Sequence, residues 1–425
     1  MKMHAAAVWT ARIVAGGLTA GPILSGAAAL AQATDGQPNH GLTRTAPAPT
    51  IGVATGKVLN AAIEALNAEQ HDEALAAIAT LHRDELSPYE NSKAEQILFS
   101  IAYAQGRYAA AREHLQRAIE AGGLNAVEIA QAQYQGAQLF MTEERWQDGA
   151  AALEEWLSTA VNPNSAAYYL LAVAYYQMGD YTRALPPAQR AVDLMDRQQE
   201  SWIGLLLALR LQREEYEEAI RLLQRLVALV PDKKTYWLQL SSVYGQVEDY
   251  VSSLAIMQLA HNAGLVTEDA EIRRLADLLL FNELPYRGAQ VLTAAIEAGT
   301  VALDHKLYEK LANCWIAARE FDHAVAPLQR AAELSSTGDA FVRLGEVHVQ
   351  REDWPAAQSA LDRAIVKGRL SDAAGAQWLM GVSLYRQQRL EDARAWFQQS
   401  EQAVRHRDAA RAYLDLIESE LAARR

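Results

Sequence analysis

An internal repeat of about 35 residues constrains this 425-residue chain more than any other feature of its sequence. One aromatic or apolar residue marks the same place in nine successive copies, at intervals of 33 to 38 residues. A period of this length is typical of arrays of helix pairs, in which each pair packs only on its neighbours. The marker residues are Tyr108, Trp146, Tyr181, Tyr216, Tyr250, Pro285, Phe321, Trp354 and Leu390.

The spacing inside each copy predicts a helical hairpin. In the clearest copy Leu171 and Ala172 precede the marker Tyr181, and Ala184 and Ala188 follow it at helical spacing. Small residues such as Ala172 let the two helices approach closely, and the marker fills the gap between neighbouring hairpins. An ordinary alanine-rich bundle is the alternative, but bundles do not keep a fixed period over nine copies.

These positions resemble the tetratricopeptide repeat (TPR) over nearly the whole chain. The resemblance implies an all-α fold, a right-handed superhelical α-solenoid of about ten helix-turn-helix repeats over residues 56–425. A weaker first copy carries Ala62, Ala74 and Ile78, and a C-terminal capping helix is expected over residues 409–422. Each marker residue is expected to open the second helix of its hairpin.

The N-terminus is of a different kind. Lys2 and Arg12 precede an apolar run rich in Ala and Gly that ends in small-x-small sites, which predicts a signal peptide over residues 1–31. An uncut membrane anchor is the alternative. Residues 32–55 are expected to form a flexible linker, because they are rich in Pro, Gly and Thr at first and lack periodicity. Secretion with a single cysteine, Cys314, favours the periplasm of a Gram-negative bacterium.

Charge and motifs exclude several classes of function. The net charge is -13, and removal of the two cations of the signal peptide makes it about -15, which disfavours nucleic acid as a partner. The sequence has no HExxH, CxxC or GxSxG motif. Its ten histidines show no metal-ligand spacing and are expected to be scattered over the surface. We therefore expect no enzyme activity, no cofactor and no metal site.

The TPR resemblance implies that the first helices line an inner groove that binds a protein or peptide segment. Exposed Tyr, Trp and Arg are the residue types that anchor interfaces, and Gln and Asn can pair with an extended main chain. Packing against the adjacent first helix is the alternative role for each of them. The candidate lining is Gln131, Tyr134, Gln138, Tyr169, Tyr176, Gln177, Leu238, Ser242, Gln246, Arg273, Asp277, Glu309, Asn313, Glu346, Trp378, Tyr385 and Arg386.

Three stretches resemble a narrower bacterial group, the secreted TPR proteins that accompany TonB–ExbB–ExbD energy-transducing systems. They are residues 234–241 (KTYWLQLS), 284–292 (LPYRGAQVL) and 328–335 (LQRAAELS). This resemblance implies a non-catalytic periplasmic scaffold in TonB-dependent uptake, with the periplasmic regions of TonB or ExbD as partners. The alternatives are a scaffold for outer-membrane assembly or cell-wall enzymes, and an enzyme with a groove-based site.

Overall fold

The computed structural model describes residues 49–424, which contain twenty-one α-helices, one short 3₁₀ helix (η1, Arg83–Glu85) and no strand. The predicted signal peptide and most of the predicted linker lie outside these residues. Helix α2 begins at Val53, so helical structure starts inside the last residues of the predicted linker. The chain divides into two compact units, the first ending at Pro231 and the second beginning at Asp232.

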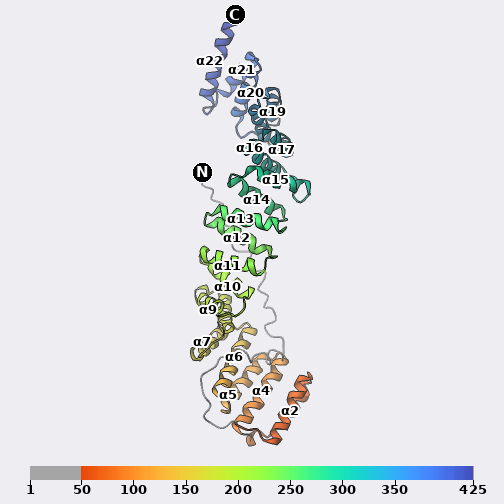
Figure 1. Ribbon diagram of the computed structural model, residues 1–425, viewed down its shortest axis with the longest axis vertical. Coiled ribbons are helices and arrows are strands. Elements are labelled where there is room, and N and C mark those ends of the chain that lie inside the picture. Colours follow the sequence, from red (N-terminus) through yellow and green to blue (C-terminus); the bar gives the residue numbers. More distant parts are fainter. Residues whose placement is uncertain (1–48, 425) are drawn as a thin grey trace. The chain divides into compact units, whose positions relative to one another are not determined.

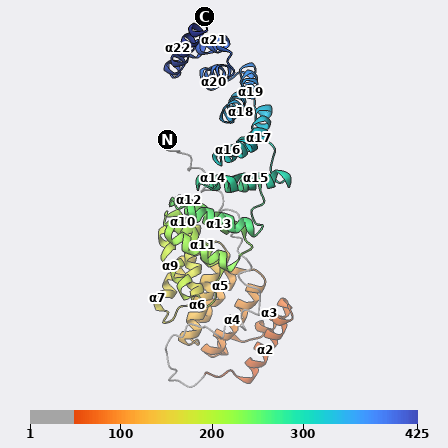
Figure 2. The same cartoon turned by 45° about the horizontal axis from the view of Figure 1, so that its top comes forward.

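The first unit contains five helical hairpins that lie side by side in chain order (Figures 1 and 2). Its first helices are α2 (Val53–Asn67), α4 (Pro88–Ala104), α6 (Ala126–Thr142), α8 (Ser165–Gln177) and α10 (Glu200–Gln212). Its second helices are α3 (His71–Ala79), α5 (Tyr108–Glu120), α7 (Trp146–Thr159), α9 (Tyr181–Leu194) and α11 (Tyr216–Leu229).

The second unit contains five more hairpins and a closing helix. Its first helices are α12 (Lys234–Gln246), α14 (Asp269–Phe281), α16 (His305–Ala317), α18 (Asp339–Gln350) and α20 (Ala373–Arg386). Its second helices are α13 (Tyr250–Asn262), α15 (Pro285–Glu297), α17 (Phe321–Leu334), α19 (Trp354–Lys367) and α21 (Leu390–Ser400), and the closing helix is α22 (Arg407–Ala423).

The predicted all-α solenoid of ten two-helix repeats with a closing helix is confirmed. All nine marker residues open the second helix of a hairpin, from Tyr108 in α5 to Leu390 in α21. The closing helix α22 covers the predicted range and extends it slightly at both ends. The right-handed superhelical twist stays a prediction. Among residues 49–424, none of the helices has the length and apolar character needed to span a bilayer.

The hairpin turns repeat one backbone geometry. The residue two positions before each second helix has a positive φ, and the following N–H donates to a carbonyl five residues back at 2.8–3.0 Å. This pairing is a Schellman C-cap, which glycine adopts with the least strain. A residue other than glycine in this left-handed conformation is strained by about 1–2 kcal/mol. Eight of the ten turns contain such a residue, so the surrounding packing must stabilise their backbone. The residues are Glu69, Gly106, Glu144, Gly179, Glu214, Glu248, Glu283, Arg319, Glu352 and Gln388.

Small residues at the helix crossings set how closely the two helices of a hairpin pack. Ala172 and Ala312 are fully buried at these crossings. Gly345 in α18 faces the buried Leu361 of α19, and a Cβ added to this glycine would lie 2.8 Å from the leucine Cγ. Protein interiors are close-packed, so the hairpin has no room for even one more methyl group at this position.

Burial was predicted from the sequence for Cys314 but not for His348. Cys314 in α16 is fully buried, as expected from its place in a first helix. The prediction that the histidines lie on the surface is wrong for His348 in α18, which is only 8% exposed. Its Nδ1 lies 3.2 Å from Nη1 of Arg351, and burial lowers the pKa of this imidazole. His348 occupies an inward-facing position of its helix, so its imidazole ring packs in the core.

The crossing contacts predict opposite effects of the same substitution in two helices. Gly345→Ala should destabilise the protein by about 1–3 kcal/mol, because the new methyl group overlaps Leu361. Gly204→Ala in α10 should stabilise it by about 0.5–1 kcal/mol, because a Cβ there meets no atom within 4 Å and alanine favours the helix. Thermal unfolding followed by circular dichroism measures both changes. Equal shifts of the two melting temperatures would contradict this account.

A capping box ties the start of α4 to the start of α2 and makes stability depend on pH. The Glu90 carboxylate accepts hydrogen bonds from the Ser87 hydroxyl (2.7 Å), the Gly52 N–H (2.9 Å) and the Ser87 N–H (2.9 Å). These bonds, the serine hydroxyl first, lower the pKa of Glu90 to about 2. Because the ionised form is favoured in the folded state, its stabilisation is complete above the ordinary carboxyl pKa and is lost as pH falls toward 2.

We therefore expect Glu90→Gln to destabilise the protein by about 1–2 kcal/mol at neutral pH, as loss of a cap does. The difference from the unmodified chain should shrink as pH is lowered from about 5 to about 2. Thermal melts over a pH series provide the measurement. Glu113→Gln, at a carboxylate that is 67% exposed on α5, is the control and should have little effect. A difference that stays constant over the pH series would argue against the capping role.

Candidate functional site

The first helices of neighbouring hairpins contact one another and form a wall in each unit. These contacts join α2 with α4 and α6 with α8 in the first unit, and α14 with α16 and α18 with α20 in the second. In the second unit, ion pairs also connect one first helix to the next. Lys234 of α12 contacts Glu268 at 2.7 Å and Glu271 at 2.9 Å, at the start of α14. The helices of this wall are those that the TPR resemblance implies as the lining of the groove.

Arg273 connects α14 to the start of α16. Its Nε donates to both carboxylate oxygens of Asp269 at 2.9 Å, one turn earlier in the same helix. Its Nη1 donates to Asp304 at 3.0 Å and its Nη2 to the carbonyl of Ala302 at 2.8 Å. Asp304 is also the N-cap of α16 and accepts from the Leu307 N–H at 2.7 Å. All three nitrogens of the guanidinium thus take part in holding two first helices together.

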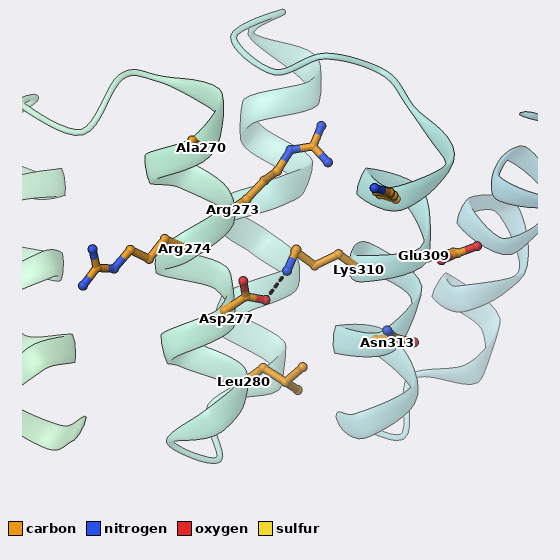
Figure 3. A pocket seen from close by; sticks show the side chains of 9 residues that line it. Ala270, Arg273, Arg274, Asp277, Leu280, Glu309, Lys310 and Asn313 are labelled. Atoms are coloured by element: carbon orange, nitrogen blue, oxygen red, sulfur yellow. Dashed lines mark hydrogen bonds and ion pairs between the residues drawn. The ribbon is translucent and has the colours of Figure 1, made fainter. Parts of the chain in front are cut away.

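A polar groove of about 460 Å³ lies between α14 and α16 (Figure 3). Its volume falls within the range of small-ligand and peptide-side-chain pockets. The side chains repeat at helical spacing along both helices, which brings one face of each helix to the groove. The lining is Ala270, Arg273, Arg274, Asp277, Leu280, Lys306, Glu309, Lys310 and Asn313.

Some groove side chains are paired with one another and others have no partner. Lys310 and Asp277 form an ion pair across the groove, whereas Arg274 and Glu309 extend in opposite directions, away from the space between the two helices (Figure 3). Arg274, Lys306 and Glu309 make no hydrogen bond or ion pair with any residue that the structure describes. Arg274 is half-buried, and burial lowers the pKa of its guanidinium. These three charges are available to a ligand.

The lining is locally positive in an acidic protein. It contains four cationic residues and two carboxylates, a difference of +2, whereas the whole chain carries -13. Unpaired guanidinium, ammonium and carboxylate groups at the edges of one groove can bind main-chain carbonyls, acidic side chains and main-chain N–H groups. The arrangement is therefore chemically suited to binding a polypeptide segment.

The cysteine beside the groove is not activated as a nucleophile. The Cys314 thiol, on the same helix as Lys310, is fully buried, and burial raises its pKa to about 11. A thiol in this state is protonated at neutral pH and is a weak nucleophile. Across residues 49–424, His, Cys, Asp and Glu side chains nowhere gather in a group of three or more that could hold a metal ion.

Three predicted groove aromatics in the first unit are half-buried against neighbouring rings. Tyr134 lies 4.8 Å from the Trp156 ring of α7, and burial raises its pKa to about 12. Tyr169 stacks on Trp202 of α10 with ring centroids 5.0 Å apart. The ring centroids of Tyr176 and Tyr181 lie 5.4 Å apart across the hairpin turn. Such ring contacts stabilise the packing of neighbouring helices. Packing against neighbouring rings therefore accounts for part of each side chain.

The predicted residues at the C-terminal end contact α19 and the closing helix. Trp378 and Tyr385 of α20 meet the Tyr413 ring of α22 edge-on, at 6.2 and 5.4 Å, and the Tyr385 hydroxyl bonds to Glu420. Arg386 is exposed and lies 5.4 Å from the Trp354 ring of α19. The capping helix therefore covers part of the last predicted groove segment.

The predicted polar residues fall at different places on the first helices. Gln177 and Gln246 are the exposed last residues of α8 and α12. Gln138 is half-buried and hydrogen-bonds Tyr134. Asn313 lines the groove itself, and its side-chain oxygen accepts from Arg343 of α18.

Four of the nine lining residues were predicted from the sequence, namely Arg273, Asp277, Glu309 and Asn313. The other five were not, and they are Ala270, Arg274, Leu280, Lys306 and Lys310. A signal for the missed cations is present, because residues 306, 309, 310 and 313 repeat at the i, i+3, i+4, i+7 spacing of one helical face.

Sequence comparison supports the tetratricopeptide repeat family. The family model described as "Tetratricopeptide repeat" matches residues 97–161, 134–198 and 342–405. These matches fall on hairpins from α4 to α9 and from α18 to α21. No curated protein matches the chain in sequence.

Several solved structures are similar to parts of the chain. A tetratricopeptide repeat protein from Parabacteroides merdae is 13% identical, with 67% of this chain and 94% of that chain covered and a TM-score of 0.37. The C-terminal part of a TPR repeat-containing protein from Cytophaga hutchinsonii is 12% identical, covering 57% and 98%, with a TM-score of 0.38. YrrB, described as a TPR protein with an unusual peptide-binding site, is 16% identical, covering 40% and 84%, with a TM-score of 0.34.

The groove geometry predicts unequal stability effects of two neighbouring cations. Arg273→Ala should destabilise the protein by about 1–2 kcal/mol, because the side chain is 15% exposed and makes four hydrogen bonds, while solvent screening at Asp304, which is 46% exposed, limits the loss. Lys310→Ala should cost less than about 1 kcal/mol, because its partner Asp277 is 56% exposed. Urea unfolding compares the two. Equal losses would mean that Arg273 is not the link described above.

Proposed function

We propose that this chain of tetratricopeptide repeats is a non-catalytic periplasmic scaffold of a TonB-dependent energy-transduction and uptake system. A stack of two-helix repeats is suited to protein–protein interaction, because it presents a long wall of first helices. The observation that carries the proposal is the groove between α14 and α16, whose lining includes three charges that no described residue neutralises. The periplasmic location follows from the predicted signal peptide, and the link to TonB from the resemblance of three stretches of sequence.

The groove favours an extended segment over a folded domain. Arg274 and Glu309 line the groove from its two helices and extend in opposite directions (Figure 3). Lys306 and Lys310 are four residues apart in α16 and therefore about one helical turn apart. An extended main chain offers carbonyl and N–H groups along its length, so donors and acceptors at separate points of the groove can each find a partner. A proline-rich segment loses little conformational entropy on docking, because its polyproline II form exists before binding.

We expect the chain without residues 1–31 to retain the periplasmic domain of TonB or ExbD in a pull-down. The triple substitution Arg274→Ala, Lys306→Ala and Glu309→Ala should reduce retention at least about tenfold, since it removes all three unpaired groove charges. These residues are half-buried or exposed and have no described partner, so the fold should be unaffected.

The matched control removes two cations and one carboxylate from second helices, through Arg190→Ala, Arg225→Ala and Glu297→Ala. It should retain the partner as the unmodified chain does. Retention of neither domain would contradict the TonB assignment. Equal loss in both triple variants would contradict the groove. Crosslinking in cells that recovers outer-membrane assembly factors or cell-wall enzymes in place of TonB components would favour a different envelope scaffold.

A further inference from the structure

An exposed apolar patch lies at the turn end of two hairpins in the second unit, apart from the groove lining. Its members, here called the turn-edge patch, come from the α12–α13 and α14–α15 turns and the helix ends beside them. Val251 is 73% exposed, Phe281 63%, Tyr286 47% and Leu284 39%, and Tyr250 is half-buried between them and the core. Exposed aromatic and aliphatic groups gathered in this way mark interaction sites more often than isolated ones do.

The patch is held rigid by contacts between the two hairpins. The Tyr250 and Phe281 rings lie 4.5 Å apart, centroid to centroid. The Asn282 side-chain amide donates to the carbonyl of Tyr250 at 3.2 Å and to that of Leu278 at 2.8 Å, which fixes the end of α14 to the start of α13. Tyr286 meets the Trp315 ring of α16, in the following hairpin, edge-on at 5.4 Å. A surface fixed before binding loses little entropy when a partner docks.

Carboxylates surround the apolar groups. Glu248 and Glu283 sit in the two turns with φ of 60° and 61°, so the backbone itself holds them beside the patch. Both are exposed, as is Asp249, the N-cap of α13. None of the three forms an ion pair with any residue that the structure describes. The one cation among residues 247–251 and 281–287 is Arg287, so the local balance is three negative charges to one positive.

We propose that the turn-edge patch docks an extended, basic, proline-containing segment of a partner protein. Exposed Tyr and Phe rings receive proline rings of a polyproline II segment, and the same rings attract nearby cations through their faces. The three carboxylates favour Lys or Arg between the prolines, by charge complementarity. The locally positive groove between α14 and α16 does not match such a basic segment, so the patch is a second surface with a different occupant.

Fluorescence anisotropy with the full chain and a labelled peptide of repeated Pro-Pro-Lys units tests the proposal. The peptide should bind, and a matched Pro-Pro-Glu peptide should not. Phe281→Ser and Tyr286→Ser should each raise Kd at least about tenfold, as truncation of an interface anchor does. Glu248→Lys with Glu283→Lys should weaken binding and reduce its dependence on salt. Val366→Ser, at an aliphatic residue of α19 that is 88% exposed, is the control and should leave Kd unchanged.

Several results would overturn the proposal. They are no binding of the Pro-Pro-Lys peptide up to about 1 mM, equal binding of the Pro-Pro-Glu peptide, or equal losses in Val366→Ser and Phe281→Ser. Sedimentation velocity tests whether the patch binds a second copy of the chain instead. Self-association that Phe281→Ser abolishes would assign the patch to that second copy. The triple groove variant should bind the peptide as the unmodified chain does. Failure of the patch proposal can therefore be distinguished from failure of the scaffold proposal. Circular dichroism confirms folding of each variant.

Discussion

The close approach of the two helices within each hairpin is the constraint on which the rest of the structure depends. Small residues such as Ala172, Ala312 and Gly345 occupy these crossings, and at Gly345 the large neighbour Leu361 fills the remaining space. Each hairpin is then too thin to bury its own apolar surface. It must pack on a neighbouring hairpin, and repetition of this rule produces, in each unit, a stack with one face made by the first helices.

On that face, some charged side chains connect the first helices and others are available to a ligand. Arg273 and Arg274 are adjacent in α14, yet the first makes four hydrogen bonds to Asp269, Asp304 and Ala302 and the second makes none with the described residues. The helical rotation of about 100° per residue turns one side chain toward the start of α16 and the other away from it. Residue type alone therefore does not distinguish a structural cation from a binding one.

The sequence was a good guide to the hairpins and a poor one to the role of each exposed side chain. The second helices begin at the nine expected residues because the same steric requirement recurs in every copy and reveals the period. The partners of Tyr169 and Tyr385 are Trp202 and Glu420, each more than 30 residues further along the chain. Such contacts occur once each and leave no repeating signal. Whether the predicted groove residues bind a partner stays a prediction.

The two surfaces of the second unit differ in charge, and this difference bears on specificity. The groove has more cations than carboxylates, whereas the turn-edge patch has more carboxylates than cations. A basic segment that suits the patch is repelled by Arg274 and Lys306, and an acidic segment that suits the groove is repelled by Glu248 and Glu283. Because both surfaces include residues of α14, one hairpin can hold two segments of opposite charge without exchanging them. A scaffold that brings two different proteins together requires this kind of discrimination.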